Sequence, residues 1–234
     1  LPAIVYFHGG GFVIASVNAY DNSARALANA SGAMVFSVAY RQAPEHPYPA
    51  PFDDAEAATE YVFANAGRLG IRPGKIAVAG ESAGGNLATS VTYRRKAKGQ
   101  RLPIHQLLVY PVTDWSRSTD ASIEKYAKAL PLNKPMLGWF KKFTYPNPDD
   151  ANRPDASPFL HPTDHFRGFP PATFVFAEID PLKTQGLDYA RKLRQAGVRT
   201  EAREYRGVAH EFFGLVGAVP QANAAQAFAG ARLK

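Results

Sequence analysis

The chain has 234 residues, of which 46% are apolar and 20% charged, and its formal net charge is +7. This length and apolar fraction predict one packed domain or two small ones, and they exclude a mainly disordered protein. The absence of cysteine excludes disulfides, thiolate metal sites, iron–sulfur clusters and a cysteine nucleophile. No apolar run reaches the roughly 18 residues typical of a membrane-spanning helix, so no membrane span is expected.

Six short apolar runs are predicted to be strands, and most of them are continuous rather than alternating in polarity. A continuous apolar run is typical of a parallel strand that is buried on both faces of its sheet. In chain order, the predicted strands are Ala3–Phe7, Ala33–Ala39, Lys75–Ala79, Gln106–Tyr110, Thr173–Ala177 and Arg199–Tyr205.

Segments with helical spacing separate most of these runs, and one more closes the chain. This alternation predicts an α/β fold, with a mostly parallel twisted sheet, helices on both faces and right-handed crossovers. The predicted helices are Ala19–Ala30, Phe52–Asn65, Ala83–Lys98, Gly186–Gln195 and Gln221–Leu233.

One long segment, from Asp114 to Pro171, contains no convincing strand. Helical spacing occurs around Ser122–Ala129 and Pro135–Phe143, and a loop rich in Pro, Asn and Asp follows. Such an excursion between two strands predicts a lid over the carboxyl edge of the sheet. We therefore expect a single domain over 1–234, with 115–170 as a lid or cap insertion. Its apolar underside would be formed by Trp115, Trp139, Phe140 and Phe143.

The densest basic run reads RRKAK at residues 94–98 and ends a predicted helix. Cations at this end of a helix complement its macrodipole. No recognition-helix, RNP or zinc-finger pattern accompanies the run, so we expect a solvated helix end and no nucleic-acid binding.

Residues 80–84 read GESAG, a G-x-S-x-G pattern between a predicted strand and a predicted helix. A strand–turn–helix of this kind holds the serine in a strained backbone conformation, with its Oγ above the sheet. Glycines on either side let neighbouring elements approach without Cβ clashes. This context predicts Ser82 as a nucleophile, and the alternative is an ordinary tight turn.

A serine nucleophile needs a base, and the chain has six histidines. His210 follows the last predicted strand, at the carboxyl edge of the sheet where Ser82 also emerges. His46 and His161 lie beside prolines in loops, and His105 precedes a strand. We therefore predict His210 as the base.

The base needs a carboxylate that fixes its tautomer. Asp180 follows the predicted strand Thr173–Ala177, and Pro181 stops further strand pairing there. Asp114 and Glu178 stay open as alternatives, Asp114 being the better of the two. The chain order Ser82, Asp180, His210 is that of the α/β-hydrolases.

The run HGGGF at residues 8–12 directly follows the first predicted strand. Consecutive glycines allow backbone N–H groups to turn towards a ligand. With the N–H of Ala83, next to the serine at a helix N-terminus, they predict a pocket for a developing oxyanion. Phosphate binding is the weaker alternative, because neither a P-loop lysine nor a G-x-G-x-x-G spacing is present.

Together, HGGGF, GESAGG at 80–85, DPL at 180–182 and the late His210 resemble the bacterial hormone-sensitive-lipase family of carboxylesterases. Residues 40–46, YRQAPEH, are similar to the family's YRLAPEH stretch, and the resemblance runs from residue 1 to about residue 213. It implies an α/β-hydrolase fold that hydrolyses short- to medium-chain acyl esters without a metal or cofactor. Carried over by motif, the nucleophile, acid and base are Ser82, Asp180 and His210, and the oxyanion donors are Gly9, Gly10 and Ala83.

Two departures from the family are visible. Residues 180–186 read DPLKTQG where the family has DPLRDEG, which changes the charge near the site but not the triad. Family members also carry several dozen residues before HGGG, including two strands and part of the cap. Without them Ala33–Ala39 would be an exposed apolar sheet edge, which is a template for aggregation. We therefore expect the native protein to have further sequence upstream.

These observations predict a serine carboxylesterase acting on a small-molecule ester, which we place in the cytoplasm. The alternatives are a non-catalytic receptor on the same fold, like the gibberellin receptors that resemble this family, and an amidase or aryl-formamidase with the same triad. The spacing HPTDH at 161–165 is nominally that of metal ligands, but its proline and its place in the lid favour a loop. A homodimer paired along Arg199–Tyr205 is a further possibility.

Overall fold

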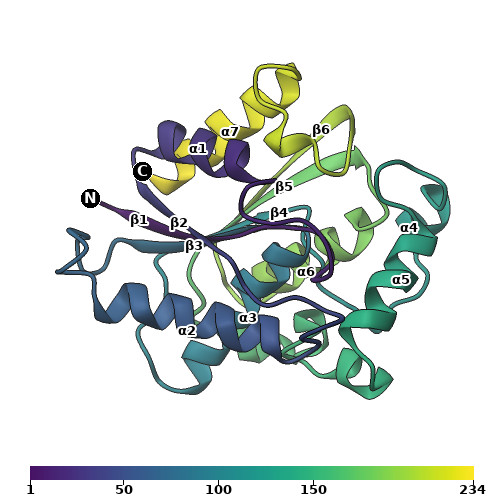
Figure 1. The fold of residues 1–234 in the computed structure, drawn as a ribbon, viewed down its shortest axis with the longest axis horizontal. Coiled ribbons are helices and arrows are strands. Elements are labelled where there is room, and N and C mark those ends of the chain that lie inside the picture. Colours follow the sequence, from purple (N-terminus) through teal and green to yellow (C-terminus); the bar gives the residue numbers. More distant parts are fainter.

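The computed structural model describes residues 1–234, and its centre is a six-stranded sheet in which every neighbouring pair of strands is parallel (Figure 1). The strand order is β2-β1-β3-β4-β5-β6. This confirms the predicted parallel sheet and all six predicted strands. Their bounds are β1 Ala3–Phe7, β2 Met34–Val38, β3 Ile76–Glu81, β4 Gln106–Val109, β5 Ala172–Ile179 and β6 Thr200–Ala209.

Three strands, β3, β5 and β6, extend further at their carboxyl ends than predicted. Polar residues and glycines at these ends interrupt the apolar pattern, although the backbone stays extended. The carboxyl ends of parallel strands meet at one edge of a sheet, where ligands bind in open α/β folds. The residues that follow these longer strands therefore lie at the same edge of the sheet.

Helices cover both faces of the sheet (Figure 1). On one face α1 packs along α7, and on the other α2 packs on α3, with α6 beside them. These five helices confirm the predicted ones. Their bounds are α1 Asp21–Ser31, α2 Ala50–Ala64, α3 Ala83–Ala97, α6 Lys183–Gln195 and α7 Pro220–Leu233.

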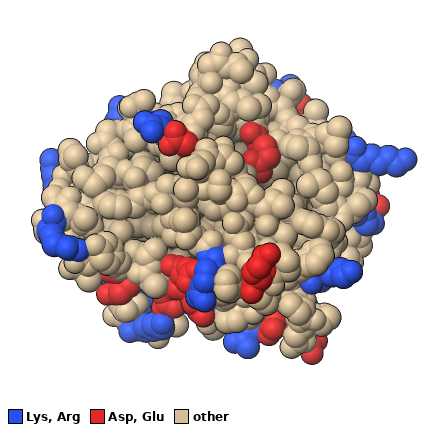
Figure 2. Space-filling view, in the orientation of Figure 1, with Lys and Arg blue, Asp and Glu red and all other residues tan.

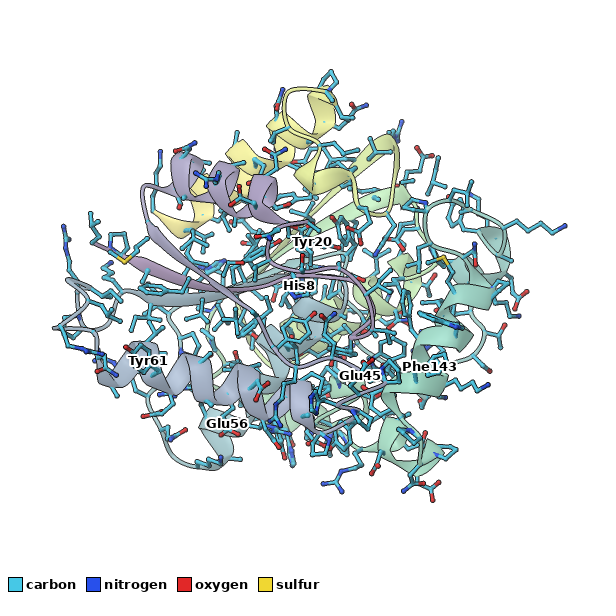
Figure 3. All side chains as sticks on the ribbon, in the orientation of Figure 1. His8, Tyr20, Glu45, Glu56, Tyr61 and Phe143 are labelled. Atoms are coloured by element: carbon cyan, nitrogen blue, oxygen red, sulfur yellow. The ribbon has the colours of Figure 1, made fainter.

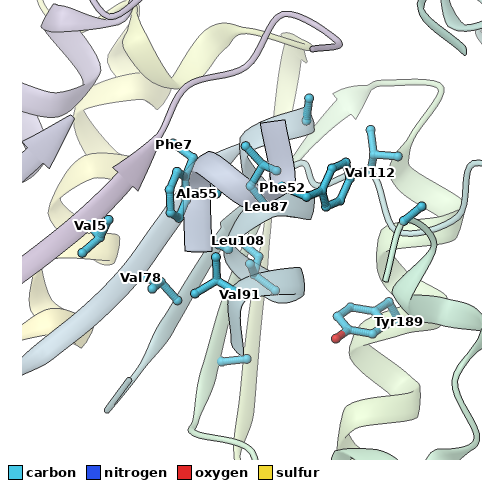
Figure 4. Close-up of a cluster of buried hydrophobic side chains, with 14 of the residues drawn as sticks. Val5, Phe7, Phe52, Ala55, Val78, Leu87, Val91, Leu108, Val112 and Tyr189 are labelled. Atoms are coloured by element: carbon cyan, nitrogen blue, oxygen red, sulfur yellow. The ribbon is translucent and has the colours of Figure 1, made fainter. Parts of the chain in front are cut away.

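The sheet separates two apolar clusters, and β1 contributes to both. Val5 and Phe7 point to the cluster beneath α2 and α3, which Figure 4 shows in close-up. Ile4 and Tyr6 point to the cluster beneath α1 and α7. Because successive side chains of a strand face opposite sides, burial on both faces requires the continuous apolar run seen in the sequence.

The two edge strands are β2 and β6, as expected for the second and the last predicted strands. The side chains of β2 are mostly half-buried, whereas every side chain of β1 is buried. Most side chains in the middle of β6 are exposed. The buried part of the sheet is therefore formed by the central strands, two of which lead into Ser82 and the HGGGF run.

Between β4 and β5 the chain forms α4, Ala121–Lys125, and α5, Lys134–Thr144, beside one end of the sheet (Figure 1). Short 3₁₀ helices η1, η2 and η3 follow at Pro148–Asn152, Pro158–Leu160 and Thr163–Phe166. Helix α4 is shorter than predicted. That this segment acts as a lid stays a prediction.

The expected apolar underside of this segment is only partly correct. Trp115 and Phe140 are buried, but Trp139 is 44% exposed and Phe143 is only half-buried. The rings of Trp139 and Phe143 pack edge-to-face against each other, 5.0 Å apart, on the outer side of α5. The two rings therefore cover part of each other's apolar surface, but they do not contribute to the core.

The prediction of a solvated basic helix end was wrong for Arg94 and Arg95. Arg95 is 2% exposed, and its guanidinium donates to the Glu60 carboxylate at 2.6 Å and to a backbone carbonyl. Acidic residues of α2 and of a facing loop account for this burial, because they pair with the basic run. The partners of Arg94 are Asp53, Glu56 and Asp155.

The surface of the molecule carries no extended basic patch on the face drawn in Figure 2, where basic and acidic side chains are interspersed. The net charge of +7 is therefore spread rather than concentrated on that face. None of the helices combines the length and the hydropathy that a membrane crossing demands.

Candidate active site

Ser82 occupies the sharp turn between β3 and α3, with φ 56° and ψ −118°. This φ is rare for a residue with a Cβ, so surrounding contacts must hold it. Its backbone N–H donates to the Val109 carbonyl at 2.9 Å. A Cβ on Gly84 would overlap the carbonyls of Phe7 and His8, so this glycine lets α3 approach the end of β1. The predicted strained turn is confirmed.

Ser82, His210 and Asp180 form one hydrogen-bonded chain, although they are far apart in sequence. His210 Nε2 lies 3.0 Å from Ser82 Oγ, and His210 Nδ1 lies 2.8 Å from Asp180 Oδ2. The other Asp180 oxygen accepts from the backbone N–H of Leu182 at 2.8 Å. All three side chains are buried. A carboxylate at Nδ1 favours the tautomer whose Nε2 can accept a proton from the serine.

The two alternative acids are engaged elsewhere. The Asp114 carboxylate accepts hydrogen bonds from Ser116 and pairs with Arg117. Glu178 accepts from the backbone N–H of Gly207. Neither carboxylate reaches the histidine, so the structure places only Asp180 where an orienting acid is needed.

The glycine run presents unused backbone donors beside the serine. The N–H groups of Gly9 and Gly10 donate to no acceptor within the protein, and Gly10 has a φ of +101° that favours glycine. Ala83 is the first residue of α3, where a backbone N–H has no intrahelical partner. The three predicted oxyanion donors therefore lie free around the turn.

Tyr40, the first residue of the YRQAPEH stretch, packs against the start of the HGGGF run. The Tyr40 hydroxyl donates to the His8 carbonyl at 2.8 Å, and the two rings stack with centroids 4.4 Å apart. His8 Nδ1 lies 2.7 Å from the Gly9 carbonyl. Figure 3 shows His8 and Tyr20 close together, and their ring centroids are 5.7 Å apart. Burial lowers the pKa of His8, so the imidazole in this position is held in its neutral form.

A cavity of about 250 Å³ opens onto Ser82 and His210. Its wall consists mainly of apolar side chains from the loop after HGGGF and from α5. Phe140 of α5 and Gly11 are in contact in this wall, because a Cβ on Gly11 would overlap the Phe140 ring. The other lining residues are Gly10, Ile14, Ala15, Tyr20, Pro131, Leu132, Met136 and Glu211.

Glu81 precedes the serine and is fully buried beneath it. Its carboxylate accepts hydrogen bonds from the hydroxyls of Tyr6 and Tyr110. The pKa of Glu81 is raised to about 7, chiefly by burial and also by the Glu211 carboxylate, while the two hydroxyls act in the opposite direction. This carboxyl is therefore partly protonated near neutral pH.

The pKa of His210 is raised above its ordinary value of 6.5. Burial is the largest single influence and lowers this pKa, but the charge and the hydrogen bond of Asp180, together with the charges of Glu211 and Glu81, outweigh burial. The ring also packs against Tyr110, with centroids 4.4 Å apart. The acidic surroundings thus favour the imidazolium that a proton-accepting histidine becomes.

No group of three or more His, Cys, Asp or Glu side chains is arranged to hold a metal ion. In the HPTDH run, His161 is buried with its ring 3.9 Å from that of Tyr93. Burial lowers the pKa of His161 to about 4, and the neighbouring His165 acts in the same direction. This histidine is a packing residue of the segment between β4 and β5.

Glu211 is the site residue that sequence reasoning missed. Its Oε1 lies 3.4 Å from His210 Nε2, and its other oxygen accepts from the Tyr20 hydroxyl. Its position next to His210 was the only signal that pointed to it. Tyr20 carries no motif and reaches the site through the fold of the loop before α1.

Comparison with known proteins agrees with this geometry. The alpha/beta hydrolase fold family matches residues 4–214 of the chain. Esterase LipI of Mycobacterium tuberculosis is 38% identical over 96% of this chain, which spans 69% of that protein. Ethyl acetate hydrolase of Pseudomonas putida is 36% identical over 94% of this chain and 69% of its own length.

Among solved structures, an esterase of Pyrobaculum calidifontis superposes with a TM-score of 0.96 at 40% identity. The superposition covers all of this chain and 76% of that one. The chain therefore belongs to the alpha/beta hydrolase fold family. Its resemblance to the carboxylesterases of the hormone-sensitive-lipase family is confirmed.

Proposed function

We propose that this protein is a serine carboxylesterase with Ser82 as nucleophile, His210 as general base and Asp180 as the acid that orients it. The observation that supports this most is the hydrogen-bonded chain from Asp180 through His210 to Ser82, which ends at an apolar cavity. Relatives with this fold are named esterases and carboxylesterases. The receptor and amidase alternatives gain no support from any feature of the site.

In the proposed reaction, Ser82 Oγ attacks the ester carbonyl carbon while its proton passes to His210 Nε2. The carbonyl electron pair moves onto oxygen, where the N–H groups of Gly9, Gly10 and Ala83 receive it. Collapse breaks the bond to the alcohol oxygen, which takes the proton from Nε2. Water then attacks the acyl carbon in the same manner and restores Ser82.

We further propose that 115–170 acts as the lid of this site, because α5 supplies Met136 and Phe140 to the cavity wall. A cavity of about 250 Å³ suits short- to medium-chain acyl groups. The pairing of Arg94 and Arg95 with carboxylates argues for a small-molecule partner rather than a nucleic acid. The exposed edge of β6 is where we propose that a homodimer would pair.

The test of this proposal is a rate profile over p-nitrophenyl esters from acetate to palmitate, together with labelling by a fluorophosphonate probe. We expect the highest kcat/KM for short to medium acyl chains, and we expect the probe to modify Ser82. Peptide mapping of the labelled protein identifies the modified serine. Rates that rise towards the C12 and C16 esters would indicate a lipase instead, and labelling of another serine would contradict the assignment.

The raised pKa of His210 predicts the pH dependence of this activity. A general base works in its neutral form, so kcat/KM should fall on acidification through a pKa above 6.5. Glu211→Gln removes one of the charges that raise this pKa, so the acid limb should move to lower pH. The charge-matched control is Glu45→Gln, at an exposed carboxylate, which should leave the limb in place. An identical acid limb in Glu211→Gln and the parent protein would contradict this account of the pKa.

A further inference from the structure

The carboxylate of Glu211 is a charged group of the cavity that takes no step in the proposed reaction. Glu211 adopts a φ of +71°, in the left-handed region that residues with a Cβ rarely occupy. Its side chain keeps 34% of its surface exposed and lines the cavity that contains Ser82. A strained residue in a binding cavity is a reason to look for a role there.

The position of this carboxylate is fixed by its neighbours. The buried Tyr20 hydroxyl donates to one oxygen, and the other oxygen lies 3.4 Å from His210 Nε2. A side chain held by this hydrogen bond presents its charge at a defined point of the cavity. That point is next to the nitrogen that handles the proton in the proposed reaction.

Nothing else in the cavity wall balances this charge. Apart from His210, the other side chains that line the cavity are uncharged, and most are apolar, such as Ile14, Leu132 and Met136. The aromatic rings of Tyr20 and Phe140 also face it. A cation beside a carboxylate and aromatic faces is stabilised where water is scarce, and an anion there is repelled.

The geometry also indicates whether the alcohol half or the acyl half of an ester would lie near the Glu211 carboxylate. The leaving alcohol takes its proton from His210 Nε2, so its oxygen must lie within hydrogen-bond distance of that nitrogen. Ser82 Oγ and Glu211 Oε1 both lie within 3.4 Å of it. An alcohol oxygen within hydrogen-bond distance of this nitrogen therefore lies close to the Glu211 carboxylate, so the alcohol is the half of the ester nearest to this charge.

Building on the proposed esterase function, we propose that Glu211 makes this site selective for esters whose alcohol carries a positive charge, that is, esters of amino or quaternary ammonium alcohols. The charge of the carboxylate attracts the cationic alcohol. The hydrogen bond from Tyr20 only fixes the position of the carboxylate. Uncharged esters remain substrates, because the triad and the oxyanion donors do not depend on a cation.

The experiment compares two butyrate esters of the same shape, the choline ester and the 3,3-dimethylbutyl ester, in which carbon replaces the charged nitrogen. We expect kcat/KM to be about tenfold or more higher for the choline ester, with most of the difference in KM. In Glu211→Gln, which keeps the shape and an acceptor for Tyr20, this ratio should fall close to one. Glu45→Gln loses the same charge at an exposed site and should keep the ratio.

The ratio is internal to each variant, so a general loss of folding or of chemistry does not move it. Inhibition of p-nitrophenyl butyrate hydrolysis by choline and by 3,3-dimethylbutanol gives the same comparison if the alkyl esters turn over slowly. Equal constants for the cationic and neutral partners in the parent protein, or an unchanged ratio in Glu211→Gln, would overturn the proposal. Failure to hydrolyse p-nitrophenyl butyrate at all would instead overturn the esterase function on which it rests.

Discussion

Replacing Ser82 by alanine is expected to lower kcat for p-nitrophenyl butyrate by about 10⁴- to 10⁶-fold. The hydroxyl is the only group that the structure places within 3.0 Å of His210 Nε2 as a nucleophile, and the chain has no cysteine to replace it. The remaining turnover would come from the oxyanion donors and the cavity acting on water. Steady-state and single-turnover kinetics of the purified variant measure the loss.

A matched control for this variant lies about two helix turns further along, in α3. Ser90 is buried, and its hydroxyl has no hydrogen-bond partner, so Ser90→Ala removes the same atom without breaking a bond. Both variants should show the circular dichroism of the parent protein, and only Ser82→Ala should lose activity. Parent-like turnover in a folded Ser82→Ala protein would refute the assignment of the nucleophile.

The strands and most helices were predictable from the sequence because a buried parallel sheet imposes a simple pattern. Every side chain of β1 is buried, so that strand must be apolar throughout, and its bounds were predicted correctly. The ends of β5 and β6 were not, since glutamate and arginine side chains there reach solvent while the backbone stays paired. The apolar pattern of a sequence indicates which side chains are buried. The backbone hydrogen bonds of a strand can continue past the last buried side chain.

Ser82 and His210 were predicted from their positions, whereas Asp180 was predicted with two alternative acids left open. Asp114 and Asp180 follow strands that end at the same sheet edge, and Glu178 lies near the end of one of these strands, β5. Which carboxylate reaches His210 depends on the turn after each strand, and a turn is set by contacts such as the Asp180–Leu182 hydrogen bond. Such contacts leave no periodic pattern in a sequence.

The environments of two charged residues could not be predicted from the sequence, for a related reason. The burial of Arg95 depends on Glu60, which lies in another helix, and the charge run by itself is typical of a solvated surface. Glu211 faces the cavity because of its positive φ and because the Tyr20 hydroxyl reaches it. In both cases the partner is distant in sequence, so no local pattern indicates the environment.

Replacing Asp180 by asparagine is expected to lower kcat/KM by about 10⁴-fold, the second-largest effect that the site predicts. An amide at this position donates to His210 Nδ1 instead of accepting from it. The imidazole then carries its proton on Nε2 and cannot take one from Ser82. The loss of the carboxylate also removes the strongest influence that raises the pKa of His210, so the acid limb of the remaining activity should move to lower pH.

The two alternative acids supply the controls, because each is a carboxylate at the same sheet edge. Asp114→Asn weakens the pair with Arg117, and Glu178→Gln weakens a hydrogen bond to backbone, so each should change kcat/KM by less than about tenfold. Stability of all three variants is compared by thermal unfolding, which separates loss of fold from loss of chemistry. A loss of about 10⁴-fold in Asp114→Asn with little loss in Asp180→Asn would contradict the assignment, because it would make Asp114 the acid that orients His210. Since Asp180 holds its second hydrogen bond to Leu182 within the same turn, we expect its carboxylate to stay on His210.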